Sequence, residues 1–93
     1  MEDEIVHDKE ENKFYKIVNG KEAYLRYIML DEKTIDMIKT YVPPELRGQG
    51  IAAEVVLAGL LYAKENGLSI IPTCSYVETY IERHQEFKEL VAE

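Results

Sequence analysis

Cysteine, membrane-length apolar segments and clustered basic residues are all scarce in this sequence of 93 residues, and each shortage excludes a class of protein. The one cysteine, Cys74, cannot form an internal disulfide and provides no CxxC pair, so no metal site is predicted. The longest charge-free apolar run, Val55 to Ala63, is far shorter than the roughly 20 residues of a membrane span. The acidic first residues also lack the basic region of a signal peptide, so we expect a cytoplasmic protein without a membrane partner.

The charge balance is strongly acidic, with 18 Asp and Glu residues against 11 Lys and Arg residues and a net charge of −7. Proteins that bind nucleic acid neutralise phosphates with clustered Lys and Arg, which this chain lacks, so nucleic acid is not an expected partner. The hydrophobic fraction of 46% and the charged fraction of 31% are ordinary for a globular protein. The length suits a single domain over residues 1–93.

The first half of the chain has the pattern of a β-meander. Lys13–Val18 and Lys21–Leu30 are β-favouring runs on either side of Asn19-Gly20, a strong hairpin signal because both positions tolerate a positive φ. Thr34–Val42 is a third run rich in β-branched residues and tyrosine. These three runs predict antiparallel strands, and the pattern leaves open whether Ile5–His7 adds a short edge strand.

The second half changes to a helical period. Apolar residues recur at helical spacing over residues 50–66, and Asn66-Gly67 is typical of a helix end. Leu68–Pro72 is almost entirely apolar, as expected for a strand buried on both faces and reached by a crossover helix. Ser75-Tyr76-Val77-Glu78 has the spacing of a capping box, so a second helix begins at Ser75 and continues into the tail, residues 85–93, with Phe87, Leu90 and Val91 facing inward. The fold class is therefore mixed α+β, in the order β-β-β-α-β-α.

A turn with two glycines lies where the third strand gives way to the first helix. Gly48 and Gly50 let a ligand approach the backbone closely, and Arg47 adds a positive charge. The first-turn amides of a helix have no intrahelical acceptors and lie at the positive end of the helix dipole. An anion such as phosphate suits this place, which the preceding Pro43-Pro44 makes rigid. A tight strand-to-helix turn without a ligand remains the other interpretation.

Two common nucleotide-binding patterns do not fit this turn. Gly48 to Ala53 formally matches the Rossmann pattern G-x-G-x-x-G/A. In that fingerprint the first glycine closes a strand directly, whereas Pro43 to Arg47 separate Val42 from Gly48 here, and no acidic residue ends the next strand. The P-loop pattern G-x-x-x-x-G-K-[ST] is absent from the sequence, so kinase and NTPase chemistry are not expected.

Arg47-Gly48-Gln49-Gly50-Ile51-Ala52 resembles the (Q/R)-x-x-G-x-(G/A) motif of the GNAT superfamily of N-acetyltransferases, with matches at Arg47, Gly50 and Ala52. The stretch from Thr40 to Phe87 is similar to very small single-domain members of that family. The resemblance implies a GNAT-like fold, in which an antiparallel meander is followed by a crossover helix, a buried parallel strand and a C-terminal helix. It also implies acetyl-CoA as cosubstrate, with its pyrophosphate on the backbone amides of the motif. The cofactor-binding residues implied are Val42, Arg47, Gly48, Gln49, Gly50, Ile51 and Ala52.

The resemblance further implies where the chemistry takes place. In the family the strands before and after the motif helix splay apart, and the pantetheine arm of the cofactor enters the gap. A backbone N–H near Val42 could stabilise the tetrahedral intermediate. Tyr80 lies where many members have the tyrosine that protonates the departing thiolate, with Tyr76 as the alternative. Amphipathic packing is the other role open to both tyrosines.

Cys74 ends the inner strand and directly precedes the second helix, whose N-terminus should lower the thiol pKa. We consider three roles for it: an acetyl-accepting nucleophile, a wall of the acetyl pocket, or an inert buried thiol. Cys74 and Tyr80 are thus the candidate catalytic residues. The sequence does not choose among the three roles.

Several departures from the family pattern bear on the acceptor. Asp36 is the only acid in the strand before the motif, and it comes so early that we expect it to lie far from the gap, which leaves His84 as an alternative base by residue type. The tight turn at Asn19-Gly20 leaves no room for the acceptor-binding helices of larger members. An open cleft on an acidic protein suits an amine-bearing partner, such as a protein or peptide lysine, a protein N-terminus or a polyamine, and charge alone does not choose among them. The alternative function is a CoA-binding or protein-interaction module with little or no acetyl transfer, and the oligomeric state is open.

Overall fold

The computed structural model describes residues 5–92 of the chain. Along the chain the elements are the strands β1 (Val6–Asp8), β2 (Lys13–Val18), β3 (Lys21–Asp31) and β4 (Thr34–Tyr41), the 3₁₀ helix η1 (Pro44–Leu46), the helix α1 (Ile51–Glu65), the strand β5 (Ser69–Ile71), the helix α2 (Ser75–Arg83) and the 3₁₀ helix η2 (Gln85–Leu90). None of the helices within residues 5–92 is long and apolar enough to cross a membrane.

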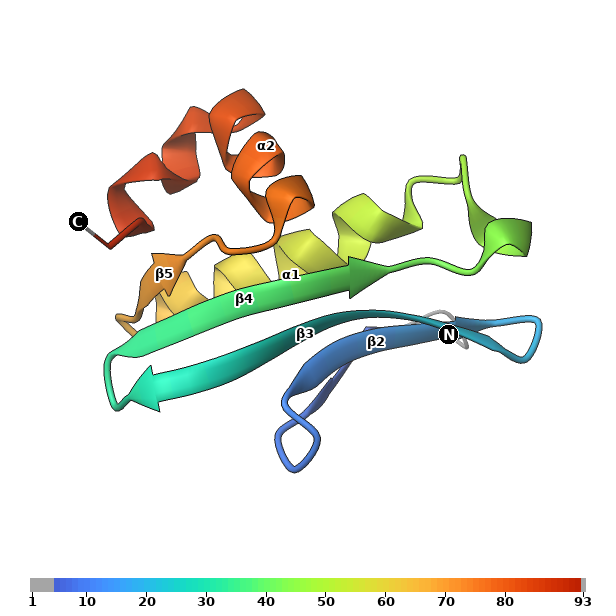
Figure 1. The fold of residues 1–93 in the computed structure, drawn as a ribbon, viewed down its shortest axis with the longest axis horizontal. Coiled ribbons are helices and arrows are strands. Elements are labelled where there is room, and N and C mark those ends of the chain that lie inside the picture. Colours follow the sequence, from blue (N-terminus) through green and yellow to red (C-terminus); the bar gives the residue numbers. More distant parts are fainter. Residues whose placement is uncertain (1–4, 93) are drawn as a thin grey trace.

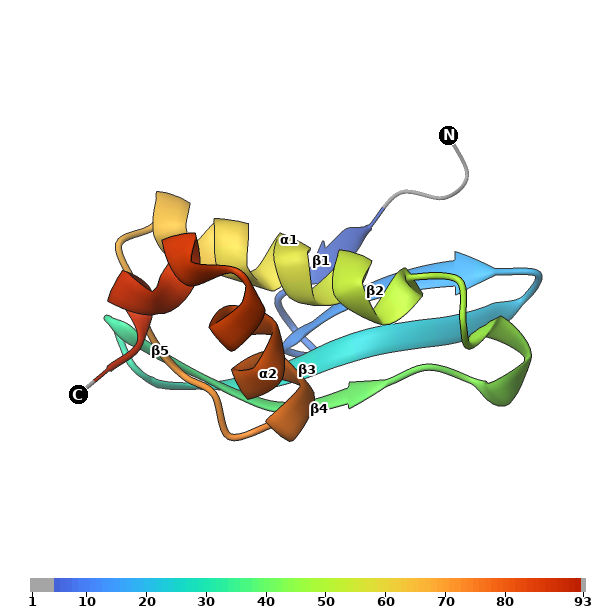
Figure 2. The same cartoon turned by 90° about the horizontal axis from the view of Figure 1, so that it is seen from above.

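The strands described over residues 5–92 form one sheet of five strands in the order β1-β2-β3-β4-β5. The first four strands pair antiparallel, and β5 pairs parallel with β4 after the crossover through α1. Figures 1 and 2 show α1 lying along one face of the sheet, with α2 above β4 and beside α1. This architecture confirms the mixed α+β fold class, the meander and the parallel fifth strand.

The hairpin between β2 and β3 turns at Asn19 and Gly20, which have φ values of 53° and 77°. Both residues therefore adopt the left-handed conformation that a two-residue hairpin turn requires. The edge strand that the sequence left undecided at Ile5–His7 does form, as β1, and it pairs with β2 along the sheet edge. The sequence thus predicted the hairpin correctly and left only this edge strand undecided.

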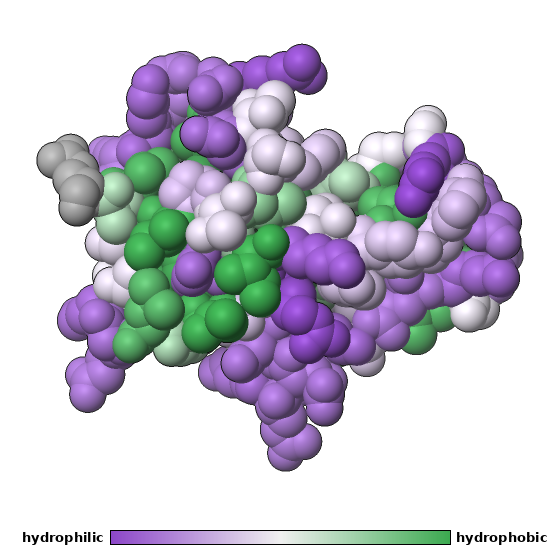
Figure 3. All heavy atoms as spheres, viewed as in Figure 1, coloured by the Kyte–Doolittle hydropathy of each residue, from purple (hydrophilic) through white to green (hydrophobic). Residues whose placement is uncertain are grey.

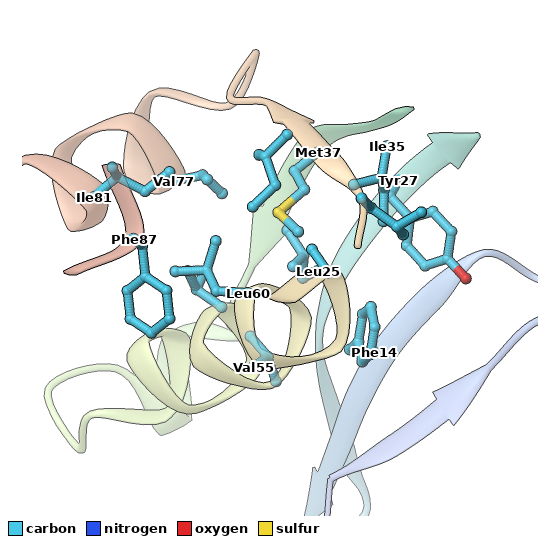
Figure 4. Close-up of a cluster of buried hydrophobic side chains, with 14 residues drawn as sticks. Phe14, Leu25, Tyr27, Ile35, Met37, Val55, Leu60, Val77, Ile81 and Phe87 are labelled. Atoms are coloured by element: carbon cyan, nitrogen blue, oxygen red, sulfur yellow. The ribbon is translucent and has the colours of Figure 1, made fainter. Parts of the chain in front are cut away.

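The main core lies between the sheet and the helices. Leu25 and Met37 from the sheet pack against Val55 and Leu60 from α1, and all four side chains are fully buried. Figure 4 shows side chains of α2 and η2 closing this cluster from the other side, namely Val77, Ile81 and Phe87. The hydrophobic core thereby fixes α2 against α1. This packing determines where the residues of α2 lie relative to the glycine turn, residues 47–50, which precedes α1.

Within residues 5–92, the helices lie on one face of the sheet and leave the outer face uncovered. Side chains alternate along a strand, so the residues next to the buried positions of β3 point outward. Ile28 and Leu30 are 45% and 52% exposed there. Figure 3 shows hydrophobic side chains gathering over the left-hand part of this face. This face of the sheet therefore carries exposed hydrophobic side chains.

The strands β4 and β5 pair over only part of the length of β4. The register runs from Thr34 with Ser69 to Asp36 with Ile71, and the last backbone link is from the Cys74 amide to the Met37 carbonyl, at 2.9 Å. Pro72 has no amide hydrogen to extend the ladder. The part of β4 beyond Met37 therefore continues without β5 as a partner, on the edge that leads to the glycine turn.

Two expectations about the C-terminal region are wrong. The helix α2 begins at Ser75, but its N-cap residue is Cys74 and no side chain makes a capping hydrogen bond, so the predicted capping box does not form. The tail does not continue α2, because His84 leaves helical geometry, with φ −128° and ψ 78°.

The His84 ring explains why α2 ends there. Its Nδ1 lies 2.9 Å from the carbonyl oxygen of Tyr80, which an α-helix would pair with the His84 amide. That amide bonds instead to the Ile81 carbonyl, at 3.1 Å, and the chain continues as η2. Phe87 is buried as expected, whereas Val91 and Ala92 pair with Ile70 along the free edge of β5. The expectation for Glu93 falls outside the described residues.

Candidate functional site

The glycine turn between β4 and α1 exposes backbone rather than side chains. Gly48 and Gly50 have φ values of 83° and 80°, and a Cβ added at either residue would meet no atom within 4 Å. Gly50 is the N-cap of α1, and the first helical bond runs from the Glu54 amide to its carbonyl. The amides of the residues between them have no intrahelical acceptor, so the turn can accept an anion on its backbone.

A small apolar cluster holds the turn against the rest of the protein. Leu46 and Ile51, on either side of the glycines, are buried together with Ala23 of β3. The Leu46 amide also bonds to the carbonyl of Pro43, at 2.9 Å, which closes η1. The turn is therefore anchored at both ends, and its amides are presented without a ligand having to order them.

Two cationic side chains set the electrostatics of the turn. The Nε of Arg47 donates to the Val42 carbonyl at 2.9 Å, so the guanidinium is tethered beside the glycines. Glu54, in the first turn of α1, would repel an anion, but the buried Lys16 pairs with its carboxylate at 2.5 Å. The start of α1 keeps its positive character because this acidic charge is neutralised.

Most of the predicted cofactor-binding residues meet in one cavity of about 230 Å³. Its lining residues are Val42, Leu46, Arg47, Gly48, Gly50, Ile51, Ala52 and Tyr76. Gln49 is the one predicted residue that does not line it, and its side-chain amide lies 3.5 Å from the carbonyl oxygen of Glu45. The cavity joins the turn to the first turn of α2 through Tyr76, a contact that the sequence did not predict.

Cys74 lies where β5 leaves β4, and its sulfur faces Thr40. The Sγ of Cys74 is 3.4 Å from the Thr40 hydroxyl oxygen. Partial burial would raise the pKa of the thiol, but the Thr40 hydroxyl and the amides of Val77, Tyr76 and Thr40 together lower it below its usual value. Thr40 was not a predicted site residue, because nothing local in the sequence links positions 40 and 74.

Asp36 lies in the part of β4 that pairs with β5. Its carboxylate accepts a hydrogen bond of 2.5 Å from Thr73, the residue that precedes Cys74. It is paired with Ile71 in the register of β4 and β5 and flanked in β4 by the inward-facing Ile35 and Met37, so it belongs to the outer face of the sheet. Asp36 lies before the unpaired part of β4 and four positions before Thr40, so the expectation that it lies far from the gap stays a prediction.

Tyr80 lines a second cavity, of about 210 Å³, between α1 and α2. Its ring stacks on His84 with the ring centroids 4.0 Å apart and an interplanar angle of 14°. Partial burial, with the negative charge of Glu86 adding to it, raises the pKa of Tyr80, so the phenol stays protonated at neutral pH. Neither described cavity brings Tyr80 and Cys74 together, so their joint role stays a prediction.

The fold and this site define an α+β protein in which a glycine turn begins the crossover helix beside an incompletely paired strand. Residues 13–90 match the sequence profile of the GCN5-related N-acetyl-transferase family. Protein NATD1 of Xenopus tropicalis is 32% identical over 82 residues, which are 86% of this chain and 75% of that protein. Protein NATD1 of Mus musculus is 30% identical over 82 residues, 86% of this chain and 74% of that protein.

A solved structure agrees with these sequence matches. The NMR solution structure of a GCN5-like protein from Staphylococcus aureus, itself proposed to be an N-acetyltransferase, superposes with a TM-score of 0.76 and 31% sequence identity. The match covers 98% of this chain and 89% of the other. The chain therefore belongs to the GCN5-related N-acetyltransferase family, as the motif at Arg47–Ala52 predicts.

Proposed function

We propose that the protein is an acetyl-CoA-dependent N-acetyltransferase that acts on a primary amine. The observation that carries the proposal is the anchored turn, in which Gly48 and Gly50 expose backbone amides beside the tethered Arg47. The pyrophosphate of acetyl-CoA supplies the anion that such a turn accepts. Family membership supports the same cosubstrate.

The pantetheine arm would leave the turn along the part of β4 that β5 does not pair. This edge runs from Tyr41 back towards Met37 and ends where Cys74 bonds to the Met37 carbonyl. An extended arm can hydrogen-bond to a free strand edge as another strand would. The thioester would then lie near Cys74 and Thr40. A backbone N–H near Val42, which the resemblance implied, would donate a hydrogen bond to the oxyanion of the tetrahedral intermediate.

The proposed reaction transfers the acetyl group from sulfur to nitrogen. The neutral amine attacks the thioester carbonyl, the new C–N bond forms, and the C–S bond breaks as the tetrahedral intermediate collapses. Asp36, on the outer face, would accept the proton that the amine loses, with Thr73 orienting its carboxylate. Tyr80 would give its proton to the departing thiolate, and Tyr76 is the alternative donor.

The acceptor is proposed to be a cationic amine, such as a protein or peptide lysine, a protein N-terminus or a polyamine. It would reach the site from the uncovered face of the sheet, where β2 and β3 join by a two-residue turn. The net charge of −7 attracts a cationic acceptor at long range. Cys74 would either form the wall of the acetyl pocket or accept the acetyl group before the amine does.

A binding module without efficient transfer is the second candidate. The observation that favours it is the same two-residue turn, which leaves no helix between β2 and β3 to bind an acceptor. A module of this kind would bind acetyl-CoA but neither hydrolyse it, nor acetylate Cys74, nor transfer to an amine. Mass spectrometry of the protein after incubation with acetyl-CoA, together with release of free CoA thiol, separates the two candidates.

The test of the cosubstrate site compares Gly50→Asp with Gly50→Asn. Asn and Asp have nearly the same shape and both tolerate a positive φ, so the two variants differ mainly in charge. We expect Gly50→Asp to bind acetyl-CoA at least about tenfold more weakly than Gly50→Asn in a calorimetric titration, because a carboxylate repels the pyrophosphate. Equal affinities in the two variants would show that the pyrophosphate lies elsewhere.

A further inference from the structure

Three basic side chains lie in one row across the outer face of the sheet. Strand pairing places Lys13 of β2 opposite Arg26 of β3, and Arg26 opposite Lys39 of β4, and these three strands lie side by side (Figure 1). Phe14, next to Lys13, and Leu25, next to Arg26, are buried on the inner face, so Lys13 and Arg26 point outward. Lys39 shares their face, because residues paired across strands lie on the same side of a sheet.

Two members of this row, Arg26 and Lys39, have charges that no acid of residues 5–92 balances in an ion pair. The third member, Lys13, pairs with Glu22 at 2.6 Å. Like charges directly opposite each other on neighbouring strands destabilise a sheet. A local cost of this kind is typical of a functional site, and an anionic group bound between the two cations would remove it.

A row of tyrosines lies beside the basic row. Tyr15, Tyr24 and Tyr41 are paired across β2, β3 and β4, and the rings of Tyr24 and Tyr41 have their centroids 5.7 Å apart. The guanidinium carbon of Arg26 is 5.5 Å from the centroid of the Tyr24 ring, which holds the cation by a cation–π interaction. Arg26 donates a hydrogen bond to the Glu11 carbonyl, at 3.4 Å, and its other donors can serve a ligand.

Lys39 lies beside the gap in which the thioester is proposed to lie. It belongs to the part of β4 that β5 does not pair, and it precedes Thr40, whose hydroxyl faces Cys74. The exposed side chain of Lys39 points to the face from which the acceptor would arrive. Asp36 lies on the same face, but three positions earlier in β4, where Thr73 donates to its carboxylate. An arriving acceptor therefore meets positive charge next to the gap.

We propose that the acceptor carries a carboxylate a few bonds from its amine and that Arg26 and Lys39 bind this carboxylate. The inference rests on the proposed function, since it narrows the acceptor of the same reaction. A carboxylate can accept hydrogen bonds from a guanidinium and an ammonium at once. An amine at Thr40 has a carboxylate of its own or the next residue within reach of the adjacent Lys39.

This chemistry separates the acceptors named above. A peptide N-terminus with an acidic first residue has both groups, and so does a free amino acid. A polyamine has no anionic group, and Arg26 and Lys39 would repel it. The net charge of −7 attracts the amine at long range, whereas the two cations act on the carboxylate at contact distance.

The test measures kcat/KM for acetyl transfer to two pairs of acceptors. The amides of the tripeptides Asp-Ala-Ala and Asn-Ala-Ala differ by a side-chain carboxylate, and alanine and alaninamide differ by a main-chain carboxylate. The proteins are the wild type, Lys39→Gln, Arg26→Gln and the control Lys64→Gln, which removes a charge from an exposed position of α1. We expect the wild type and Lys64→Gln to prefer the carboxylate-bearing acceptor by about fivefold, and the other two variants to lose most of that preference.

Each preference is a ratio between two acceptors in one protein, so weaker binding of acetyl-CoA in a variant does not alter it. A preference in either pair that Lys39→Gln and Arg26→Gln reduce supports the proposal, and the pair that shows it identifies a peptide side chain or a free amino acid as the source. Equal transfer to both members of both pairs in the wild type, or a preference that both variants retain, overturns the proposal and leaves the proposed function in place.

Absence of transfer to all four acceptors would count against the proposed function instead. Calorimetric affinities for the same acceptors, measured in the presence of CoA, then test the two cations separately from the chemistry. A carboxylate preference in binding that Lys39→Gln reduces would support the site at Arg26 and Lys39. Equal affinities within both pairs would overturn it.

Discussion

The hydroxyl of Thr40 and the thiol of Cys74, 34 positions apart in the sequence, lie 3.4 Å from each other where β4 loses its parallel partner. The Thr40 hydroxyl is among the groups that hold the pKa of Cys74 below its usual value despite partial burial of the sulfur. A lower pKa means more thiolate at neutral pH, which is the form that reacts with a thioester. The pair therefore connects the geometry of the sheet to the reactivity of the one cysteine.

Replacing Thr40 with valine should make Cys74 less reactive. Thr40→Val keeps the size of the side chain and removes the hydroxyl, so the pKa of the thiol rises and the thiolate fraction at neutral pH falls. We expect slower alkylation by iodoacetamide near pH 7.5 and a rate profile shifted to higher pH. The chain has a single cysteine, so the rate reports this site alone. Thr34→Val, at the other end of β4, serves as the control, and an unchanged profile in Thr40→Val would refute the role of the hydroxyl.

Asp36→Asn should impair acetyl transfer without weakening the binding of acetyl-CoA. Loss of a general base costs about 100-fold in turnover at neutral pH. The defect should shrink at high pH, where the acceptor amine loses its proton to solvent. Turnover with an amine acceptor and calorimetric affinity are the two measurements, and Glu32→Gln at an exposed turn is the control. Full turnover in Asp36→Asn near pH 7 would assign the base elsewhere.

Tyr80→Phe tests the proton donor while keeping the ring stacked on His84. We expect turnover to fall by about 100-fold, with acetyl-CoA affinity unchanged, because only the hydroxyl is removed. Tyr76→Phe is measured in parallel, since Tyr76 lines the cavity of the glycine turn. Loss of turnover in Tyr76→Phe alone would transfer the acid role to Tyr76.

The stability of the fold should decrease below about pH 6.5 because of His7. The His7 ring stacks on Phe14 and its Nε2 lies 2.6 Å from the Tyr27 hydroxyl. Partial burial, with a contribution from Lys9, lowers the pKa of His7 in the folded state. The unfolded chain then takes up the proton first, so stability is complete above the unfolded pKa and is lost as pH falls.

We expect the urea midpoint of the wild type to fall between pH 7 and pH 5.5, and that of His7→Phe to fall less. Phenylalanine keeps a ring against Phe14 and does not titrate, although it gives up the contact with Tyr27. The comparison therefore uses the change with pH in each protein rather than the absolute midpoints. Equal changes in the two proteins would show that other groups cause the loss of stability.

Gly59→Ala should destabilise the protein although alanine favours helices. A Cβ at Gly59 would lie 2.6 Å from Cδ2 of Leu25 and 3.3 Å from Cε of Met37, both fully buried in the sheet. Overpacking outweighs the gain in helix propensity, and we expect a net loss of about 1–2 kcal/mol in urea unfolding. The double variant Gly59→Ala with Leu25→Ala should lose less than the sum of the single losses, because the truncated side chain makes room. Additive losses would contradict the contact.

Features that depend on the local backbone were predicted from the sequence, whereas features that depend on competing or distant contacts were missed. The hairpin at Asn19-Gly20 and the glycine turn both need positive φ values, which particular residue types favour. The hairpin and the start of α1 could therefore be predicted from the sequence alone. The end of α2 was missed because the bond from the His84 ring to the Tyr80 carbonyl competes with the helix, and apolar spacing is the same in either case. Phe87 is buried in η2 as it would have been in a continued helix.

The sequence by itself determined the order of strands and helices, the fold class and the turn that marks the family, since these depend on local backbone preference and periodic burial. Tertiary structure decided which distant residues meet. The ending of β5 beside Asp36 brings Thr73 and Cys74 to Asp36 and Thr40, and the packing of α2 on α1 joins Tyr76 to the glycine turn. Such contacts depend on where the core allows elements to stop and pack, and no local pattern in the chain specifies that.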